Sequence, residues 1–228
     1  MKLRILGTRG EIPLSAPRHE NHSGMLIDDT ILIDFGEVSY ATYKPQAIFI
    51  THLHPDHAIF MRGPCPVPEV PIYAPERRDL PFLKLLPKVS EVQGCRITAV
   101  PTKHSARVVS RAFLIESKGK RVLYTGDLLS IDKKYLAQLG MIDVVVTEAS
   151  AMREGGIVRK NQTGLLFGHA GVPDLVRLFA PHTKRIILTH FGSWFMKDVR
   201  AGTRELQALG KTYGADIAIA RDGEVFLV

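Results

Sequence analysis

The chain of 228 residues is 45% hydrophobic and 23% charged, with a formal net charge of +7 at pH 7. This composition excludes a disordered or fibrous protein and predicts one globular domain spanning residues 1–228. No apolar run approaches the ~20 residues of a membrane helix, and the N-terminal sequence lacks an apolar core of signal-peptide length. We therefore expect a cytoplasmic protein without membrane association. The basic charge favours polyanions or phosphate-bearing substrates as partners.

Strands dominate the first two thirds of the predicted structure, as short β-branched runs bounded by turn residues. A tight turn at "DD" joins the second and third strands. Residues 63–87 contain seven prolines, which predicts a loop around one short strand, with at most a brief helix. The predicted strands are Lys2–Leu6, Gly24–Ile27, Thr30–Asp34, Gln46–Thr51, Arg96–Val100, Ala112–Glu116, Arg121–Tyr124 and Asp143–Thr147.

Helices and strands alternate in the last third of the chain. Apolar residues at helical spacing predict a helix over Val172–Ala180 and an amphipathic helix over Met196–Tyr213. A strand is predicted at Lys184–Thr189, and Asp216–Ala220 with Glu224–Val228 are predicted to form a closing hairpin around "RDG". Strand-rich first and βαβ-like later, the pattern predicts a mixed α/β sandwich.

The segment "THLHPDH", residues 51–57, places three histidines and an aspartate at the end of a buried strand. If the chain stays extended, His52 and His54 point the same way, because strand side chains alternate. Pro55 then breaks the strand, and Asp56 and His57 can face a second point. Imidazole and carboxylate groups suit zinc, manganese or iron, so one segment could serve two adjacent metal ions. The competing interpretation is a cluster of solvated loop residues.

Three further candidate ligands follow predicted strands: His104, Asp127 and His190. Each alone would more often be an ordinary polar residue at a strand end, but together they supply the ligands that the first cluster lacks. A carboxylate such as Asp127 can bridge two cations, with one oxygen to each. The two cysteines, Cys65 and Cys95, are too few for a four-cysteine zinc site and are expected to be reduced.

These motifs, in this order, resemble those of the metallo-β-lactamase superfamily through most of the chain. Asp34, in "ILIDFG", is similar to the aspartate that supports the metal-binding loop in that superfamily. The resemblance implies an αβ/βα four-layer sandwich, with two mixed β-sheets flanked by helices and the metals at the sheet edge. It also implies one metal at His52, His54 and His104, a second at Asp56, His57 and His190, and Asp127 bridging the two. A hydroxide held between the cations would then attack the substrate, with Asp56 orienting it.

The branch is suggested by two segments. The stretch "LGTRGEIPLSAPRHENHSGMLID" resembles the start of the ribonuclease Z-like and cyclic phosphodiesterase-like branch. "FGHAG", residues 167–171, resembles the segment that carries the extra histidine of that branch, which makes His169 a candidate general acid or phosphate contact. The alternative for His169 is a helix N-terminal residue without a catalytic role. Only 22 residues separate His104 from Asp127, too few for the long arm of transfer-RNA-processing members.

The sequence thus predicts a dinuclear metal-dependent hydrolase, foremost a phosphodiesterase acting on cyclic nucleotides or small phosphodiesters. The expected cofactors are two divalent ions, foremost zinc, with manganese or iron as alternatives. A ribonuclease and a lactone or thioester hydrolase stay open, and a non-catalytic nucleic-acid-binding module is the weakest alternative. RNA as a partner, a homodimer as the assembly, and pocket roles for His19, His22 and Arg18 also stay open.

Overall fold

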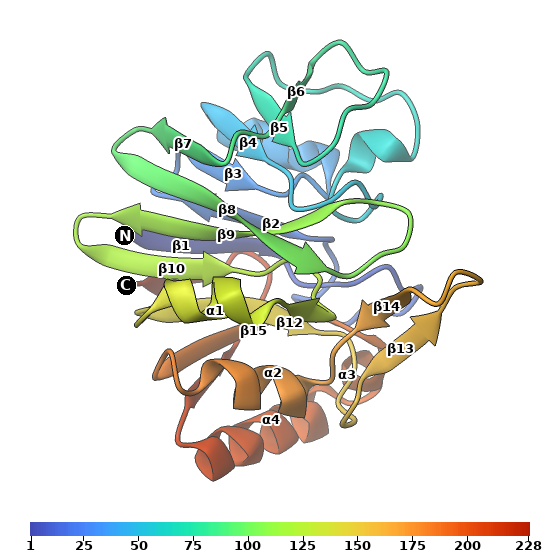
Figure 1. The fold of residues 1–228 in the computed structure, drawn as a ribbon, viewed down its shortest axis with the longest axis vertical. Coiled ribbons are helices and arrows are strands. Elements are labelled where there is room, and N and C mark those ends of the chain that lie inside the picture. The colour runs from blue at the N-terminus through green and yellow to red at the C-terminus, as the bar shows by residue number, and fades with distance from the viewer.

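Two β-sheets packed face to face form the centre of the protein, as the computed structural model of residues 1–228 shows (Figure 1). The first sheet has the order β17 (Val225–Leu227), β1 (Lys2–Gly7), β2 (Gly24–Ile27), β3 (Ile31–Ile33), β4 (Ala47–Phe49), β5 (Ile72–Ala74), β6 (Leu83–Leu85). Its strands from β17 to β3 pair antiparallel, and those from β3 to β6 pair parallel.

The second sheet is also mixed. Its order is β11 (Ser130–Ile131), β8 (Cys95–Lys103), β9 (Ser110–Ser117), β10 (Lys120–Tyr124), β12 (Val144–Ala149), β15 (Arg185–Phe191), β16 (Asp216–Ile219), and β7 (Val89–Val92) also pairs with β8. The pairs from β10 to β16 are parallel. Parallel strands end at the same edge of a sheet, so the loops that follow them meet there.

Alternation along the strands buries both faces of the second sheet. In β9, Phe113 and Ile115 pack into the core between the sheets, whereas Leu114 packs into the core beneath the helices. The same split separates Val145 of β12 from its neighbours Val144 and Val146. Side chains two residues apart share a face, so a continuous apolar strand supplies two cores at once.

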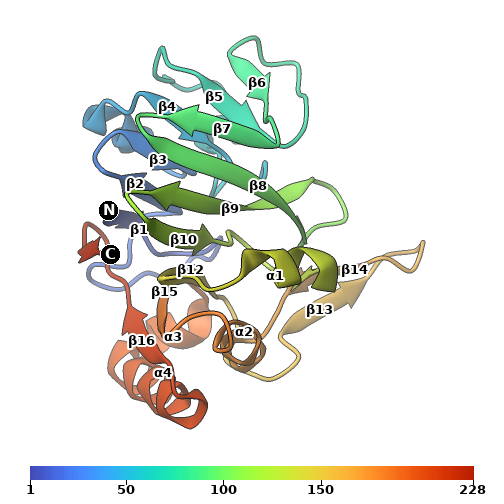
Figure 2. The ribbon, with the colours of Figure 1, turned by 60° about the vertical axis from the view of Figure 1, so that its left-hand side comes forward.

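Helices cover the outer face of the second sheet (Figures 1 and 2). They are α1 (Lys133–Leu139), α2 (Val172–Phe179), α3 (Ser193–Lys197) and α4 (Val199–Tyr213). Two short 3-10 helices, η1 (Val38–Tyr43) and η2 (Ile59–Met61), pack with the neighbouring loops against the first sheet. The predicted sandwich is confirmed, and its layer outside the first sheet contains 3-10 turns. None of the helices combines the length and apolar composition that a membrane span requires.

The predicted closing hairpin is wrong. Strand β16 joins the second sheet beside β15, and β17 joins the first sheet beside β1, so the "RDG" turn carries the chain from one sheet to the other. Asp222 in that turn accepts hydrogen bonds from the backbone of Glu20 and Asn21 and from the Thr8 hydroxyl. These bonds hold the turn against the N-terminal loop instead of letting the two strands pair with each other.

Two other predictions need correction. The amphipathic helix predicted over Met196–Tyr213 is interrupted at Asp198, whose extended backbone separates α3 from α4 and whose carboxylate accepts a hydrogen bond from the Ala201 amide. An aspartate in this position caps the second helix. The proline-rich residues 63–87 contain two strands, β5 and β6, where one was predicted.

A separate hairpin was not predicted at all. It consists of β13 (Ile157–Lys160) and β14 (Leu166–His169), which pair only with each other and project from the body of the protein (Figures 1 and 2). Asn161 forms the turn, because its side-chain oxygen accepts hydrogen bonds from the backbone of Thr163 and Leu165.

Candidate metal centre

The seven predicted ligands come together at one edge of the two sheets. The "THLHPDH" segment follows β4, and His104 and Asp127 follow β8 and β10. His190 lies within β15, one residue before the strand ends. All seven side chains are buried or half-buried. The fold therefore places ligands from four separate parts of the sequence around one point.

The first group contains His52, His54, His104 and Asp127. Nε2 of His52 and Nε2 of His104 lie 3.0 and 3.2 Å from Nδ1 of His54. Oδ2 of Asp127 lies 3.6 Å from Nε2 of His52 and 3.4 Å from Nε2 of His104. Three imidazole nitrogens and a carboxylate oxygen thus face one another.

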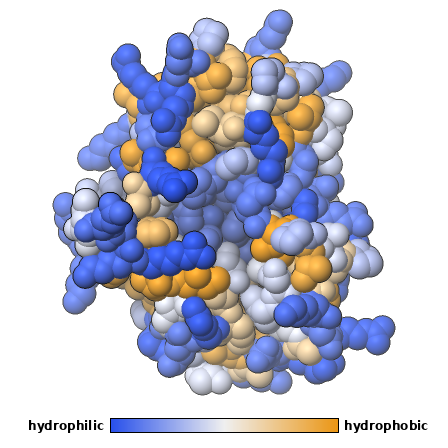
Figure 3. Space-filling model, turned by 90° about the vertical axis from the view of Figure 1, so that its right-hand side faces the viewer, coloured by the Kyte–Doolittle hydropathy of each residue, from blue (hydrophilic) through white to orange (hydrophobic).

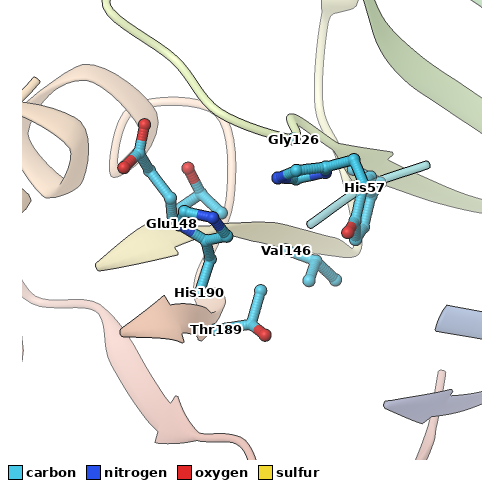
Figure 4. A pocket seen from close by; sticks show the side chains of 8 residues that line it. His57, Gly126, Val146, Glu148, Thr189 and His190 are labelled. Atoms are coloured by element: carbon cyan, nitrogen blue, oxygen red, sulfur yellow. The ribbon is translucent and has the colours of Figure 1, made fainter. Parts of the chain in front are cut away.

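The second group contains Asp56, His57, His190 and again Asp127. Nε2 of His190 lies 2.9 Å from Oδ2 of Asp56 and 3.3 Å from Oδ1 of Asp127. Nε2 of His57 lies 3.1 Å from the same Oδ1 atom. Figure 4 shows the rings of His57 and His190 projecting into a shared space. The second group therefore has two nitrogens and two carboxylates.

Asp127 belongs to both groups, with Oδ2 toward the first and Oδ1 toward the second. Gly126 permits this placement, because its φ of +57° lies in the left-handed region and a Cβ atom there would lie 2.8 Å from the side chain of Thr51. One carboxylate oxygen to each group is the arrangement of a bridging ligand.

Hydrogen bonds at the rear of three rings orient the ligands. Nδ1 of His104 lies 2.8 Å from the carbonyl oxygen of Gly168, to which it can only donate. Nδ1 of His57 lies 2.8 Å from the Asp34 carboxylate, and Nδ1 of His190 lies 3.0 Å from the Ser150 hydroxyl. A proton held on Nδ1 leaves the Nε2 lone pair directed at the centre of the site, as metal-binding histidines require.

Asp34 supports the loop in the way that the sequence suggested. Its buried carboxylate accepts hydrogen bonds from the Thr51 amide at 2.8 Å, the Thr51 hydroxyl at 2.9 Å and the Tyr124 hydroxyl at 3.2 Å, in addition to its contact with His57. Its φ of +61° is in the left-handed region, which aspartate tolerates better than most residues. Asp34 thus fixes both the start of the loop and one imidazole.

The donor set fits divalent cations. Oδ1 of Asp127 is buried and has no hydrogen-bond partner, although two imidazole nitrogens face it. Burial alone would raise the pKa of Asp127, but His190, His57 and His104 hold it well below its ordinary value, so the carboxylate is ionised. Burial and the neighbouring His104 lower the pKa of His54 to about 4, which keeps its lone pairs free. These clusters are compatible with a dinuclear site of the kind that nitrogen and oxygen ligands form with zinc, manganese or iron.

His169 lies beside the two groups and is hydrogen-bonded to Glu148, a residue that the sequence analysis missed. Nδ1 of His169 lies 2.7 Å from Oε2 of Glu148 and 4.0 Å from Oδ2 of Asp127. Burial disfavours the charged imidazole, but the Glu148 carboxylate outweighs it and raises the pKa of His169 to about 9. His169 lies at the end of β14 and not at the N-terminus of α2, which corrects the position assumed in the alternative without a catalytic role.

Glu148 is fully buried at the end of β12, and its other oxygen accepts a hydrogen bond from the Leu128 amide. Figure 4 shows it beside His190. A carboxylate directly after the apolar run "VVVT" was a usable signal, because Asp127 also comes shortly after a buried strand, β10. The predicted strand ended at Thr147, whereas β12 continues through Glu148 to Ala149.

An open cleft of about 1230 Å³ lies above the ligands. Figure 3 shows this face of the molecule hollowed and lined with hydrophilic residues. Its floor includes His54, Asp56, Asp127 and His190. Three arginines and several apolar side chains form its walls, namely Arg107, Arg153, Arg159, Ile12, Met152, Ile157, Phe167 and Trp194.

His19, His22 and Arg18, for which a pocket role was left open, do not line this cleft. Gly10, Glu11 and Ile12 of the same loop do. His19 is buried against Phe191, and its Nδ1 lies 2.8 Å from the Thr8 hydroxyl. His22 is bound to Glu37 at 2.6 Å. Arg18 is exposed. The contacts of both histidines are those of structural residues.

Comparisons with known proteins agree with this fold. The family model described as a beta-lactamase superfamily domain matches residues 21–181. The fold is similar to that of the metallo-beta-lactamase fold protein YhfI from Bacillus subtilis, at 18% identity and a TM-score of 0.70 over 99% of this chain and 98% of that one. A diphosphatase from the PhnP family matches at 16% identity and 0.70, over 100% and 97% of the two chains. The short form of human tRNase Z matches at 17% and 0.66, over 100% and 99%. No curated protein sequence matches.

Proposed function

The chain belongs to the β-lactamase superfamily, and we propose that it is a dinuclear metal-dependent phosphodiesterase. The proposed ligands are His52, His54 and His104 for one cation, Asp56, His57 and His190 for the other, and Asp127 as the bridge. When bound, two divalent cations supply a nucleophilic water at neutral pH and stabilise developing negative charge. We propose zinc as the metal. Manganese and iron are the alternatives, because nitrogen-rich sites of this kind suit all three metals.

The positive charge of the cleft lining is the observation that favours a phosphodiester as the substrate. Arg107, Arg153, Arg159 and the imidazole of His169 line it, whereas the one acidic wall residue, Glu11, is paired with Arg62. A phosphodiester carries a negative charge that this lining stabilises, whereas a lactone or thioester carries none. The charge therefore favours phosphodiesters over neutral carbonyl esters. Two proteins of similar fold are a diphosphatase and a tRNase, which also supports the proposal.

Two side chains at the cleft floor have different proposed roles, one toward the attacking water and the other toward the phosphate or the leaving oxygen. Asp56, a proposed metal ligand, would also orient the attacking water by accepting its hydrogen bond. His169, held by Glu148, lies on the other side of Asp127 and donates a hydrogen bond to a phosphate oxygen or a proton to the leaving oxygen. The small phosphodiesters and cyclic nucleotides suggested by the sequence are the proposed substrates, with RNA as the second candidate because the cleft is basic.

A substrate panel tests the proposal. Metal-loaded protein is assayed with bis(4-nitrophenyl) phosphate, 2′,3′- and 3′,5′-cyclic nucleotides, short RNA, a lactone and a thioester. We expect turnover of phosphodiesters and none of the carbonyl substrates. Turnover confined to the lactone or thioester would overturn the phosphodiesterase and leave the metal-dependent hydrolase in place.

A further inference from the structure

The β13–β14 hairpin forms one wall of the cleft, and its pairing sorts its side chains onto two faces. Ile157 lies opposite His169, and Arg159 lies opposite Phe167. All four of these residues line the cleft. The hairpin thus extends a row of cleft-facing side chains outward from the candidate catalytic histidine.

The other face of the hairpin points away from the cleft. Val158, Lys160 and Leu166 alternate with the cleft-facing residues, as side chains of a strand must, and none of them lines the cleft. Arg159 and Lys160 are therefore adjacent cations on opposite faces of one strand. The same holds for Phe167 and Leu166, an aromatic and an apolar neighbour on opposite faces.

The Arg159–Phe167 pair stands one strand repeat beyond the Ile157–His169 pair, about 7 Å along the hairpin. This separation matches one further group of a substrate whose scissile phosphate lies at His169. Arg159 is exposed and lines the cleft, so its guanidinium can bind an anion in a bidentate manner. Phe167 beside it offers a ring face on which a planar base can stack.

The size of the cleft also points to more than one substrate unit. Its volume of about 1230 Å³ exceeds the roughly 300–1,000 Å³ of typical small-molecule sites. A cyclic mononucleotide has a single phosphate and would leave Arg159 unused. A linear substrate with a second phosphate would use both the floor of the cleft and the hairpin.

We infer that Arg159 and Phe167 form a specificity subsite for the unit next to the scissile phosphate, and that this subsite selects phosphodiesters carrying a second phosphate. The inference rests on the proposed phosphodiesterase function and narrows its substrates. Arg159 contributes affinity for the second phosphate, and Phe167 contributes stacking of the base between the two phosphates.

Kinetics with three dinucleotides test the subsite: ApA, pApA and ApAp, which carry no terminal phosphate, a 5′ one and a 3′ one. The wild type should prefer one of the two phosphorylated forms over ApA. Arg159→Gln should lower kcat/KM for that form about tenfold, because the charge-assisted hydrogen bonds of the guanidinium to the second phosphate are lost. Its kcat/KM for ApA and bis(4-nitrophenyl) phosphate should stay within about twofold of wild type.

Lys160→Gln is the matched control, because it removes the same charge from the outer face and should leave the preference intact. Phe167→Ala should weaken turnover of all three dinucleotides, whereas Leu166→Ala should not. Equal effects of Arg159→Gln and Lys160→Gln, or a wild type without preference for a terminal phosphate, would overturn the subsite.

Binding separates failure of the subsite from failure of the proposed reaction. Fluorescently labelled pApA and ApAp are titrated with metal-free protein, and anisotropy is followed at several salt concentrations. Arg159→Gln should weaken binding of the preferred form about tenfold and reduce its salt dependence, and Lys160→Gln should not. Such a contrast without turnover of any phosphodiester would sustain the subsite and refute the phosphodiesterase. Turnover of phosphodiesters with equal binding by Arg159→Gln and Lys160→Gln would sustain the phosphodiesterase and refute the subsite.

Discussion

The carboxylate of Glu148 accepts a hydrogen bond of 2.7 Å from Nδ1 of His169. The two residues come from different strands, and the Leu128 amide, next to Asp127, binds the other oxygen of Glu148. This carboxylate therefore fixes the candidate acid in position relative to the candidate bridging ligand. It also raises the pKa of His169 to about 9 against the effect of burial, which keeps the imidazole protonated at neutral pH.

Replacing His169 should slow hydrolysis without removing the metals. His169→Ala should keep about two cations per chain, because Nδ1 of His169 is engaged with Glu148 and the seven proposed ligands are unchanged. Its rate on a nucleotide ester should fall by roughly 10²–10⁴-fold, the range for a lost acid–base group. The loss should be smaller for bis(4-nitrophenyl) phosphate, whose acidic phenol leaves without a proton. Steady-state kinetics on both substrates, with elemental analysis, provide the check.

Equal losses on the two substrates would assign His169 to phosphate binding instead of proton donation. An unchanged rate on both would remove it from the reaction.

Neutralising Glu148 should move the alkaline limb of the pH–rate profile. In Glu148→Gln the amide oxygen can still accept from Leu128, but the charge that raises the pKa of His169 is gone. The proton of His169 should then be lost at lower pH, so activity on a nucleotide ester should decline from a pH below about 9. Glu154→Gln, an exposed change on the loop before the hairpin, is the control. A limb that stays at the wild-type pH would contradict the role given to Glu148.

Much of the site could be predicted from sequence because each ligand follows an apolar strand. In β4, β10 and β15 the buried run makes the strand visible, and a polar group at its end has few structural reasons to be there. The same logic covers Glu148, which directly follows the predicted strand Asp143–Thr147. The ligands' common location then follows from the rule that parallel strands end at one sheet edge.

Features set by long-range contacts could not be predicted in this way. The strands β16 and β17 have the spacing of a hairpin, but their partners, β15 and β1, are fixed by tertiary packing and by the contacts of Asp222. The β13–β14 hairpin is short and exposed, so its residues show no clean alternation of apolar and polar types. Its only local signal is the turn-forming Asn161.

Removing the bridging carboxylate should loosen the metals. Asp127→Ala deletes the one side chain that faces both groups, so bound metal should fall from about two cations per chain to one or none, and activity should be lost. The fold should persist, since Asp127 makes no hydrogen bond through Oδ1. Asp132→Ala, an exposed aspartate five positions later, should retain both cations. Elemental analysis and circular dichroism measure the two effects, and full metal content in Asp127→Ala would refute the bridge.

Stability should depend on pH through His19, a buried histidine outside the metal centre. Burial, with the charges of Arg221 and Arg18, lowers the pKa of His19 to about 4 in the folded protein, whereas the unfolded chain has a value near 6.5. Between these values the unfolded state binds more protons, so the contribution of His19 to stability is present above about 6.5 and is lost as pH falls toward about 4. His19→Gln removes this contribution, and the free energy of unfolding should then rise less steeply with pH over the same interval. Urea unfolding of chelator-treated wild type and variant at several pH values gives the two slopes. Parallel slopes would mean that His19 has the same pKa in the folded and unfolded states, so that burial does not lower it.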